Sequence, residues 1–147
     1  MKCNLFMKEA IKEALIAKQQ GEVPVGAVVV KNGEIVGRGY NKRENLLSPL
    51  AHAEIEAIHE AAKNLGSWRL TDCDLYVTLE PCPMCAGAII NARISRVFYG
   101  AYDSKAGSFG SLCDLSVMKY DSAPEIHGGI LEHECKEILS TFFESLR

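Results

Sequence analysis

The apolar positions of the chain follow two periodicities, one typical of helices and one typical of strands. From Asn4 to Gln20 apolar residues recur every three or four positions among lysines and glutamates, and Gly21 follows, which predicts an amphipathic helix. The apolar run Ala27–Val30 and residues 34–39 predict two strands, joined by a type I′ turn at Asn32-Gly33. The chain is therefore expected to begin with a helix and a β-hairpin.

The same periodicities continue after the hairpin. Residues 41–50 are polar and contain proline, which predicts a loop, and helical spacing then begins at His52. The segments 75–79 and 97–99 have the β-branched and aromatic residues of strands, and a helix is predicted between them, with Pro81 in its first turn. A glycine-bearing loop over 101–111 and a last helix over 130–146 follow.

Helices that alternate with strands predict an α/β fold, a three-layer α/β/α sandwich with helices on both faces of a sheet. The 147 residues are expected to form a single domain, 1–147. A chain of this length buries about 70% of the surface that its unfolded form exposes, so it needs no structural metal to fold. A metal site in this chain therefore indicates a function.

Composition and charge narrow the class of protein. The net charge of −3 argues against a protein that coats nucleic acid non-specifically. It is still compatible with a local basic patch on the folded surface. No apolar run approaches the roughly 20 residues of a membrane span, so no membrane partner is expected. The N-terminus shows no signal peptide, and the six cysteines are interpreted as the reduced thiols of a cytoplasmic protein. Four of them lack partners at ligand spacing and are predicted to be buried or partly buried apolar residues: Cys3, Cys73, Cys113 and Cys135.

The other two cysteines belong to the strongest chemical signal in the chain. Cys82 and Cys85 open one predicted helix, and His52 and Glu54 open another. Residues two apart do not share a helix face, so His52 and Glu54 can address one metal only from the end of a helix. Imidazole and thiolates are zinc ligands, and three protein ligands leave a fourth position for water, as in catalytic sites. The sequence predicts one zinc per chain, held by His52, Cys82 and Cys85, with Glu54 as general base.

Two other functions share part of this pattern. A CxxC motif that follows a strand and opens a helix is also typical of thiol–disulfide oxidoreductases. A zinc-stabilised RNA-binding module without catalysis would use the same ligands. The first interpretation leaves His52 and Glu54 unexplained, and the second has no need of Glu54.

The segments His52-Ala53-Glu54 and Pro81-Cys82-x-x-Cys85 resemble the H-x-E…P-C-x-x-C signature of zinc nucleobase deaminases. Within that superfamily the chain resembles the bacterial tRNA wobble-adenosine deaminases. The segments that carry this resemblance are Glu22–Ala27, Thr78–Cys82, Met84–Ala88 and Asp103-x-Lys105-x-Gly107. It implies a cytidine-deaminase-like fold with a central mixed five-stranded sheet, and a homodimer.

The resemblance also implies an activity, the hydrolytic deamination of adenosine to inosine at the wobble position of a tRNA anticodon loop, with Glu54 as proton shuttle. It implies that Asn41 contacts the target nucleoside, and that Asp103 is a candidate for reading the 2′-hydroxyl of RNA. The residues that it implies in substrate binding are Asn41, Val25, Ala53, Asp103, Lys105, Phe142 and Phe143. Ser48-Pro49-Leu50 departs from the Asp-Pro-Thr that is common in the family. The alternative is a free nucleobase or nucleotide deaminase, of the guanine or cytidine type, with the same zinc chemistry.

Overall fold

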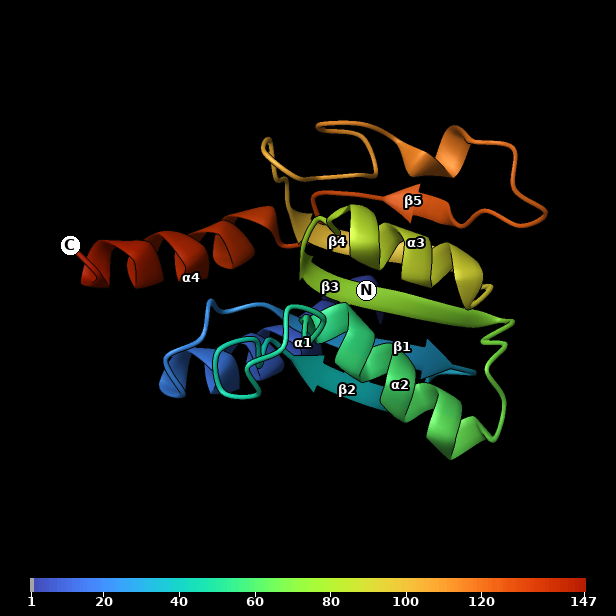
Figure 1. Ribbon diagram of the computed structural model, residues 1–147, viewed down its shortest axis with the longest axis horizontal. Coiled ribbons are helices and arrows are strands. Elements are labelled where there is room, and N and C mark those ends of the chain that lie inside the picture. The colour runs from blue at the N-terminus through green and yellow to red at the C-terminus, as the bar shows by residue number, and fades with distance from the viewer. Residues whose placement is uncertain (1) are drawn as a thin grey trace.

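The computed structural model describes residues 2–147, which alternate helices and strands from end to end (Figure 1). The elements are α1 (Lys2–Gln19), β1 (Gly26–Lys31), β2 (Glu34–Tyr40), α2 (Ala53–Leu65), β3 (Cys73–Leu79), α3 (Pro83–Asn91), β4 (Arg96–Ala101), the short 3-10 helix η1 (Leu115–Val117), β5 (Glu125–His127) and α4 (Glu132–Ser145). No helix within residues 2–147 is long and apolar enough to cross a membrane.

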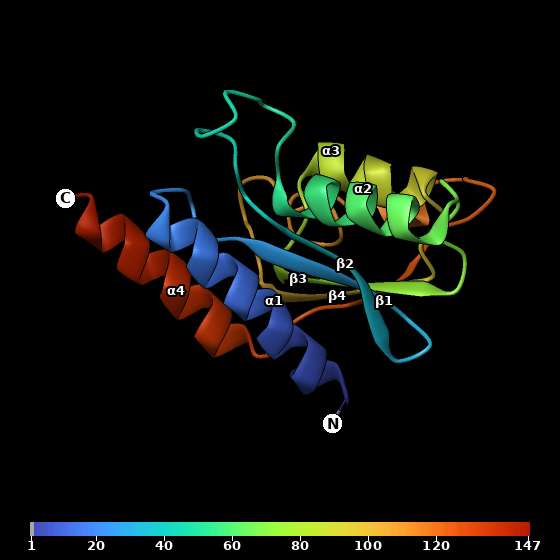
Figure 2. The same cartoon turned by 90° about the horizontal axis from the view of Figure 1, so that it is seen from below.

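The five strands form one mixed sheet in the order β2-β1-β3-β4-β5. Strand β1 is antiparallel to both β2 and β3, whereas β4 is parallel to both β3 and β5. Helices α2 and α3 cover one face of this sheet, and α1 and α4 cover the other (Figure 2). The predicted three-layer sandwich and its mixed five-stranded sheet are confirmed.

Two apolar cores explain why the central strands are apolar without interruption. Ala27 and Val29 of β1 pack toward α2 and α3, while Val28 and Val30 pack toward α1 and α4. Side chains alternate between the faces of a strand, so a strand covered on both faces must be apolar at successive positions. The sheet thus has an apolar layer on each face, and none of the three predicted metal ligands belongs to either layer.

The predicted elements agree with the structure apart from their ends, the first turn of α3 and strand β5. Asn32 and Gly33 both have positive φ, as a type I′ turn requires. The first turn of α3 contains Pro83 and not Pro81, because the helix begins one residue after Cys82. Strand β5 has only three residues, too few for its periodicity to be recognised. The prediction for Cys113 was wrong, since this thiol lies exposed on the 102–124 segment.

A close contact between β2 and α2 sets the position of the α2 start. A Cβ atom at Gly39 would lie 2.4 Å from the carbonyl oxygen of Ala53 and 2.5 Å from the amide nitrogen of Ala57. Both atoms are helix backbone, which cannot rotate away. Glycine at this position therefore lets the first turn of α2 lie directly against the sheet.

We expect Gly39→Ala to lower the free energy of unfolding by about 1–3 kcal/mol, the usual cost of overpacking. Gly87 provides a matched control, because a Cβ atom on this exposed position of α3 would meet nothing within 4 Å. Gly87→Ala should be neutral or should stabilise the protein by about 0.5–1 kcal/mol. Denaturant titration of both variants measures the difference, and equal effects would contradict the role of Gly39.

Candidate active site

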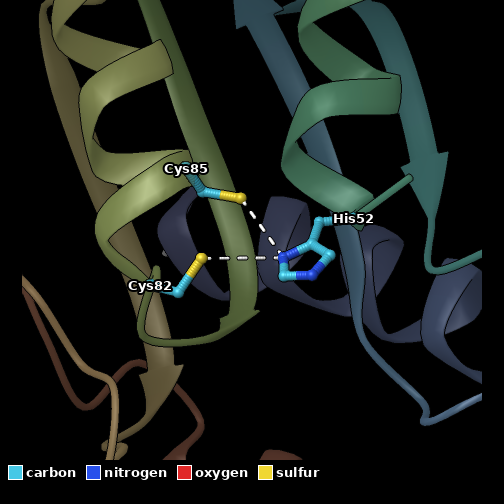
Figure 3. Close-up of side chains that lie close together, drawn as sticks. All are labelled: His52, Cys82 and Cys85. Carbon is cyan, nitrogen blue, oxygen red and sulfur yellow. Dashed lines mark hydrogen bonds between the residues drawn. The ribbon is translucent and has the colours of Figure 1, made fainter. Parts of the chain in front are cut away.

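The start of α2 and the start of α3 lie side by side and present the predicted ligands to each other (Figure 3). His52 is the N-cap residue of α2 and Cys82 is the N-cap residue of α3, both with extended backbone. Cys85 is three residues further on and shares the direction of Cys82. The predicted convergence of the two helix starts is what the structure shows.

The three ligand atoms have the spacing of a tetrahedral metal site. His52 Nδ1 lies 3.6 Å from Cys82 Sγ and 3.5 Å from Cys85 Sγ, and all three atoms lie within 4.8 Å of one another. A tetrahedral zinc with bonds of about 2.0 Å to nitrogen and about 2.3 Å to sulfur holds such atoms about 3.5 Å apart. The donor set and its spacing therefore fit zinc, with Nδ1 as the imidazole ligand.

The three groups of this cluster shift one another's pKa. A hydrogen bond from Cys85 lowers the pKa of the Cys82 thiol to about 4, and the same hydrogen bond raises the pKa of Cys85. The hydrogen bond to Cys82 also raises the pKa of the His52 imidazole. A metal ligand must be deprotonated, so metal binding at this cluster is expected to depend on pH.

Glu54 lies beside the cluster and is 4% exposed. Removal from water raises the pKa of its carboxyl group to about 7. This carboxyl group lines a cavity of about 200 Å³, far larger than the ~30 Å³ share of one water molecule. The cavity has room for a group of nucleobase size directly next to the ligand cluster.

The walls of this cavity contain most of the residues that the sequence analysis selected. The selected residues that line it are Val25, Asn41, His52, Ala53, Glu54, Cys82 and Asp103, while Cys85 is buried behind it. Five further lining residues were not selected: Val23, Arg43, Leu79, Glu80 and Ala106. Val23, Leu79 and Glu80 lie within the segments that carry the family resemblance, and this resemblance is the only signal in the sequence that points to them.

Two hydrogen bonds with backbone groups hold the side chain of Asn41 in the cavity wall. Its Nδ2 donates to the carbonyl oxygen of Val23 at 3.2 Å, and its Oδ1 accepts from the amide of Arg43 at 3.1 Å. The side-chain amide has a second N–H and a second lone pair. Asn41 is thus fixed in orientation and retains one donor and one acceptor for a ligand.

A groove adjoins the cavity and shares Val23, Leu79 and Asp103 with it. Lys105, Tyr102 and Phe143 also line this groove. The two aromatic residues of α4 differ in exposure, since Phe143 is 47% exposed and Phe142 is 7% exposed. The two rings lie edge to face with their centroids 5.5 Å apart, and the burial of Phe142 leaves the surface contact expected of the pair to Phe143.

Comparison with known proteins places these features in a family. Residues 1–147 match the family described as MafB19-like deaminase. The chain is 52% identical over 145 residues to the tRNA-specific adenosine deaminase of Bacillus subtilis (strain 168), which amounts to 98% of this chain and 90% of that protein.

Solved structures show the same relationship. The chain superposes with a TM-score of 0.87 on a structure from a study of A-to-I editing by tRNA:A34 deaminases at the wobble position of transfer RNA. The two are 46% identical, and the match covers 91% of this chain and 98% of the other. A guanine deaminase from Bacillus subtilis is 37% identical, with a TM-score of 0.66 and coverage of 95% and 90%.

Proposed function

The chain belongs to the deaminase family of these relatives, that of the tRNA-specific adenosine deaminases, and we propose that it hydrolyses adenosine to inosine at the wobble position of a tRNA anticodon loop. The observation that carries this proposal is the ligand triad with zinc spacing at the wall of a cavity of nucleobase size, beside the buried carboxyl of Glu54. We further propose that residues 1–147 act as one domain, because lining residues between positions 23 and 106 build one cavity.

One zinc per chain, held by His52, Cys82 and Cys85, would supply a Lewis acid that makes water acidic enough to give up a proton near neutral pH. Glu54 accepts that proton and passes it to N1 of the adenine, which makes C6 electrophilic. Oxygen from water then bonds to C6. Glu54 carries the second proton of that water, from the new hydroxyl group on C6, to the departing amino group; the C6–N bond breaks, a carbonyl forms at C6, and ammonia leaves.

The groove beside the cavity favours RNA as the substrate and not a free base. A free base fills only the cavity, whereas nucleotides on either side of it need a surface of their own. Phe143 and Tyr102 offer aromatic faces there, and Lys105 offers a positive charge for phosphate. A base in an anticodon loop also leaves its stack at lower cost than a base in a duplex.

The rival activities meet specific obstacles in this geometry. An oxidoreductase needs only its two thiols, whereas here a third group, the imidazole of His52, lies within 3.6 Å of both sulfur atoms, as a third metal ligand would. A zinc-stabilised RNA-binding module has no use for a carboxyl group as buried as that of Glu54. A guanine deaminase shares the chemistry and is the remaining alternative.

One assay tests the proposal. The zinc-loaded protein is incubated with an anticodon stem-loop that has adenosine at the wobble position, and separately with adenosine, cytidine and guanine. Inosine in the stem-loop, without ammonia release from the free compounds, is the expected result. Ammonia release from guanine together with an unchanged stem-loop would favour the alternative activity.

We also propose that the protein works as a homodimer in the cytoplasm. Large apolar side chains lie exposed at several places on the surface, and exposed apolar surface often marks interfaces. They include Trp68 beside α2 and α3, Leu46, Leu47 and Leu50 on the loop after β2, and Leu112, Val117 and Met118 on the segment after β4. Light scattering should return the mass of two chains. The cytoplasm is supported by the tRNA substrate and by the six free cysteines of the described residues.

Asp103 is the residue that we expect to read the sugar. It lies where the cavity meets the groove, and its Oδ1 accepts from the amides of Lys105 and Ala106. Asp103→Asn keeps the shape but removes the charge that strengthens a hydrogen bond from a 2′-hydroxyl. We expect kcat/KM for the RNA stem-loop to fall by about tenfold or more, with little change for the same loop made of deoxynucleotides.

Exposed Asp72, which is remote from the cavity, supplies the control variant Asp72→Asn. Equal losses of activity on the ribonucleotide and deoxyribonucleotide loops in Asp103→Asn would contradict this role.

A further inference from the structure

Two glutamates outside the ligand cluster are almost completely buried. Glu22, between α1 and β1, is 1% exposed, and Glu80, directly after β3, is 2% exposed. A carboxylate is costly to bury unless its oxygens accept hydrogen bonds. Both side chains accept several, and the donors belong to two loops that contribute walls of the cavity.

Glu80 is surrounded by amides of the loop that follows β4. Its Oε1 accepts from the amide of Asp103 at 3.1 Å, and its Oε2 accepts from the amides of Phe109 at 3.2 Å and Ser111 at 3.0 Å. The Ser111 hydroxyl donates to the same carboxylate. The backbone of Glu80 is itself tied to β4, since its amide donates to the carbonyl of Ala101 at 2.9 Å. The carboxylate therefore fixes this loop to the sheet.

The loop closes tightly over Glu80 because position 107 is glycine. A Cβ atom at Gly107 would lie 2.4 Å from Cδ of Glu80 and 2.4 Å from the carbonyl oxygen of Asp103. The same loop turns Asp103 and Ala106 into the cavity. The position of this wall therefore depends on direct contact between the loop and the carboxylate.

Glu22 holds the loop on the other side in the same way. Its Oε1 accepts from the amide of Glu44 at 3.0 Å, and its Oε2 accepts from the amide and the side-chain Nδ2 of Asn45, both at 2.7 Å. This loop carries Asn41 and Arg43 into the cavity. Each of the two loops is thus tied to a separate buried carboxylate.

We propose, on the basis of the function proposed above, that Glu22 and Glu80 are positioning residues that hold the two loops of the cavity in their substrate-binding arrangement. A loop that has lost its carboxylate must be ordered by the substrate at the moment of binding, and that ordering costs affinity. The metal ligands and Glu54 lie at helix starts, outside both loops. Loss of either carboxylate should therefore raise KM far more than it lowers kcat.

The test compares Glu80→Gln and Glu22→Gln with the native protein. Glutamine has the same shape but turns one acceptor oxygen into a donor that faces other donors. We expect KM for the anticodon stem-loop to rise by about tenfold or more in each variant, as for the loss of hydrogen bonds to a charged group. We expect kcat to change by less than about threefold, and metal content to stay the same.

Hydrogen exchange of backbone amides shows which of the two loops each substitution affects. Glu80→Gln should deprotect the amides of Asp103, Phe109 and Ser111 without affecting residues 44–45, and Glu22→Gln should do the reverse. Glu13→Gln is the matched control, because Glu13 is a buried glutamate that pairs with Arg38 on the opposite face of the sheet. It should leave both KM and the exchange of both loops unchanged.

Unchanged KM and unchanged exchange in Glu80→Gln and Glu22→Gln would overturn the proposal, as would a fall in kcat at constant KM. If Glu80→Gln does not fold, Ser111→Ala, which removes only the hydroxyl donor, must show a smaller rise in KM and deprotection of the same loop. A native protein that forms no inosine would instead refute the proposed function, and amide exchange would still decide what the two carboxylates hold.

Discussion

A Glu54→Gln variant will fold and bind metal as the native chain does, yet its kcat for inosine formation will fall by about 10²–10⁴-fold, the usual contribution of a general acid–base group. Glutamine fills the same buried space but cannot accept the proton of water or deliver it to the base. The loss should appear in kcat and kcat/KM alike, because proton transfer belongs to the transition state. Single-turnover measurement on an anticodon stem-loop, together with metal analysis, checks this result.

Glu56→Gln is the matched control for this experiment. Glu56 lies in the same first turn of α2, but it lines a polar groove with Arg38 and Lys63 and has no place in the cavity. Its replacement should leave kcat within about twofold of the native value. Near-native turnover in Glu54→Gln would remove this carboxyl group from the proposed mechanism.

Replacement of Cys85 by alanine should abolish stoichiometric metal binding and reduce inosine formation to background. The variant keeps His52 and Cys82, but two ligands define no tetrahedral site with an open fourth position. The protein should also lose the stabilisation that metal binding provides, about 4 kcal/mol at a free metal concentration 1,000-fold above the dissociation constant. Metal analysis and thermal unfolding with and without added zinc measure both effects.

Chelation of the native protein should reproduce the loss of activity and of thermal stability while secondary structure persists. Both apolar cores form around the sheet without the ligand cluster, so circular dichroism of the metal-free protein should match that of the loaded one. Cys113→Ser, which changes an exposed thiol, is the control and should alter none of these quantities. Unfolding on chelation would show that the metal is structural, as in small zinc modules.

Most of the secondary structure could be predicted because it follows from local periodicity. The run Ala27–Val30, the turn at Asn32-Gly33 and the helix that begins after His52 each contain their own signal within a few residues. Strand β5 contains no such signal. It forms because Val97 and Phe98 of β4 offer a parallel edge to Ile126 and His127, and His127 stacks on Phe98 at 4.9 Å.

The ligand set could also be selected from sequence, because imidazole and thiolate side chains at helix starts are rare and chemically specific. The cavity walls could not be selected in the same way. Arg43 and Ala106 are ordinary residues that line the cavity only because of the paths of their loops, and Leu79 lines it only because strand β3 ends there. Phe142 and Phe143 are adjacent in sequence and alike in chemistry, and only packing decides that one is buried and the other exposed.

The sequence by itself determined the elements other than η1 and β5, the three-layer arrangement and the choice of His52, Cys82 and Cys85 with Glu54, since each of these depends on short-range spacing or on side-chain chemistry. Only the tertiary structure decided that Nδ1 faces the two thiols, that Asp103 lines both cavity and groove, and that Glu22 and Glu80 accept hydrogen bonds from the two loops. The physical reason is the separation of the partners along the chain. Glu80 accepts hydrogen bonds from residues more than 20 positions away, and such partners are brought together only by the packing of the whole sheet and its helices.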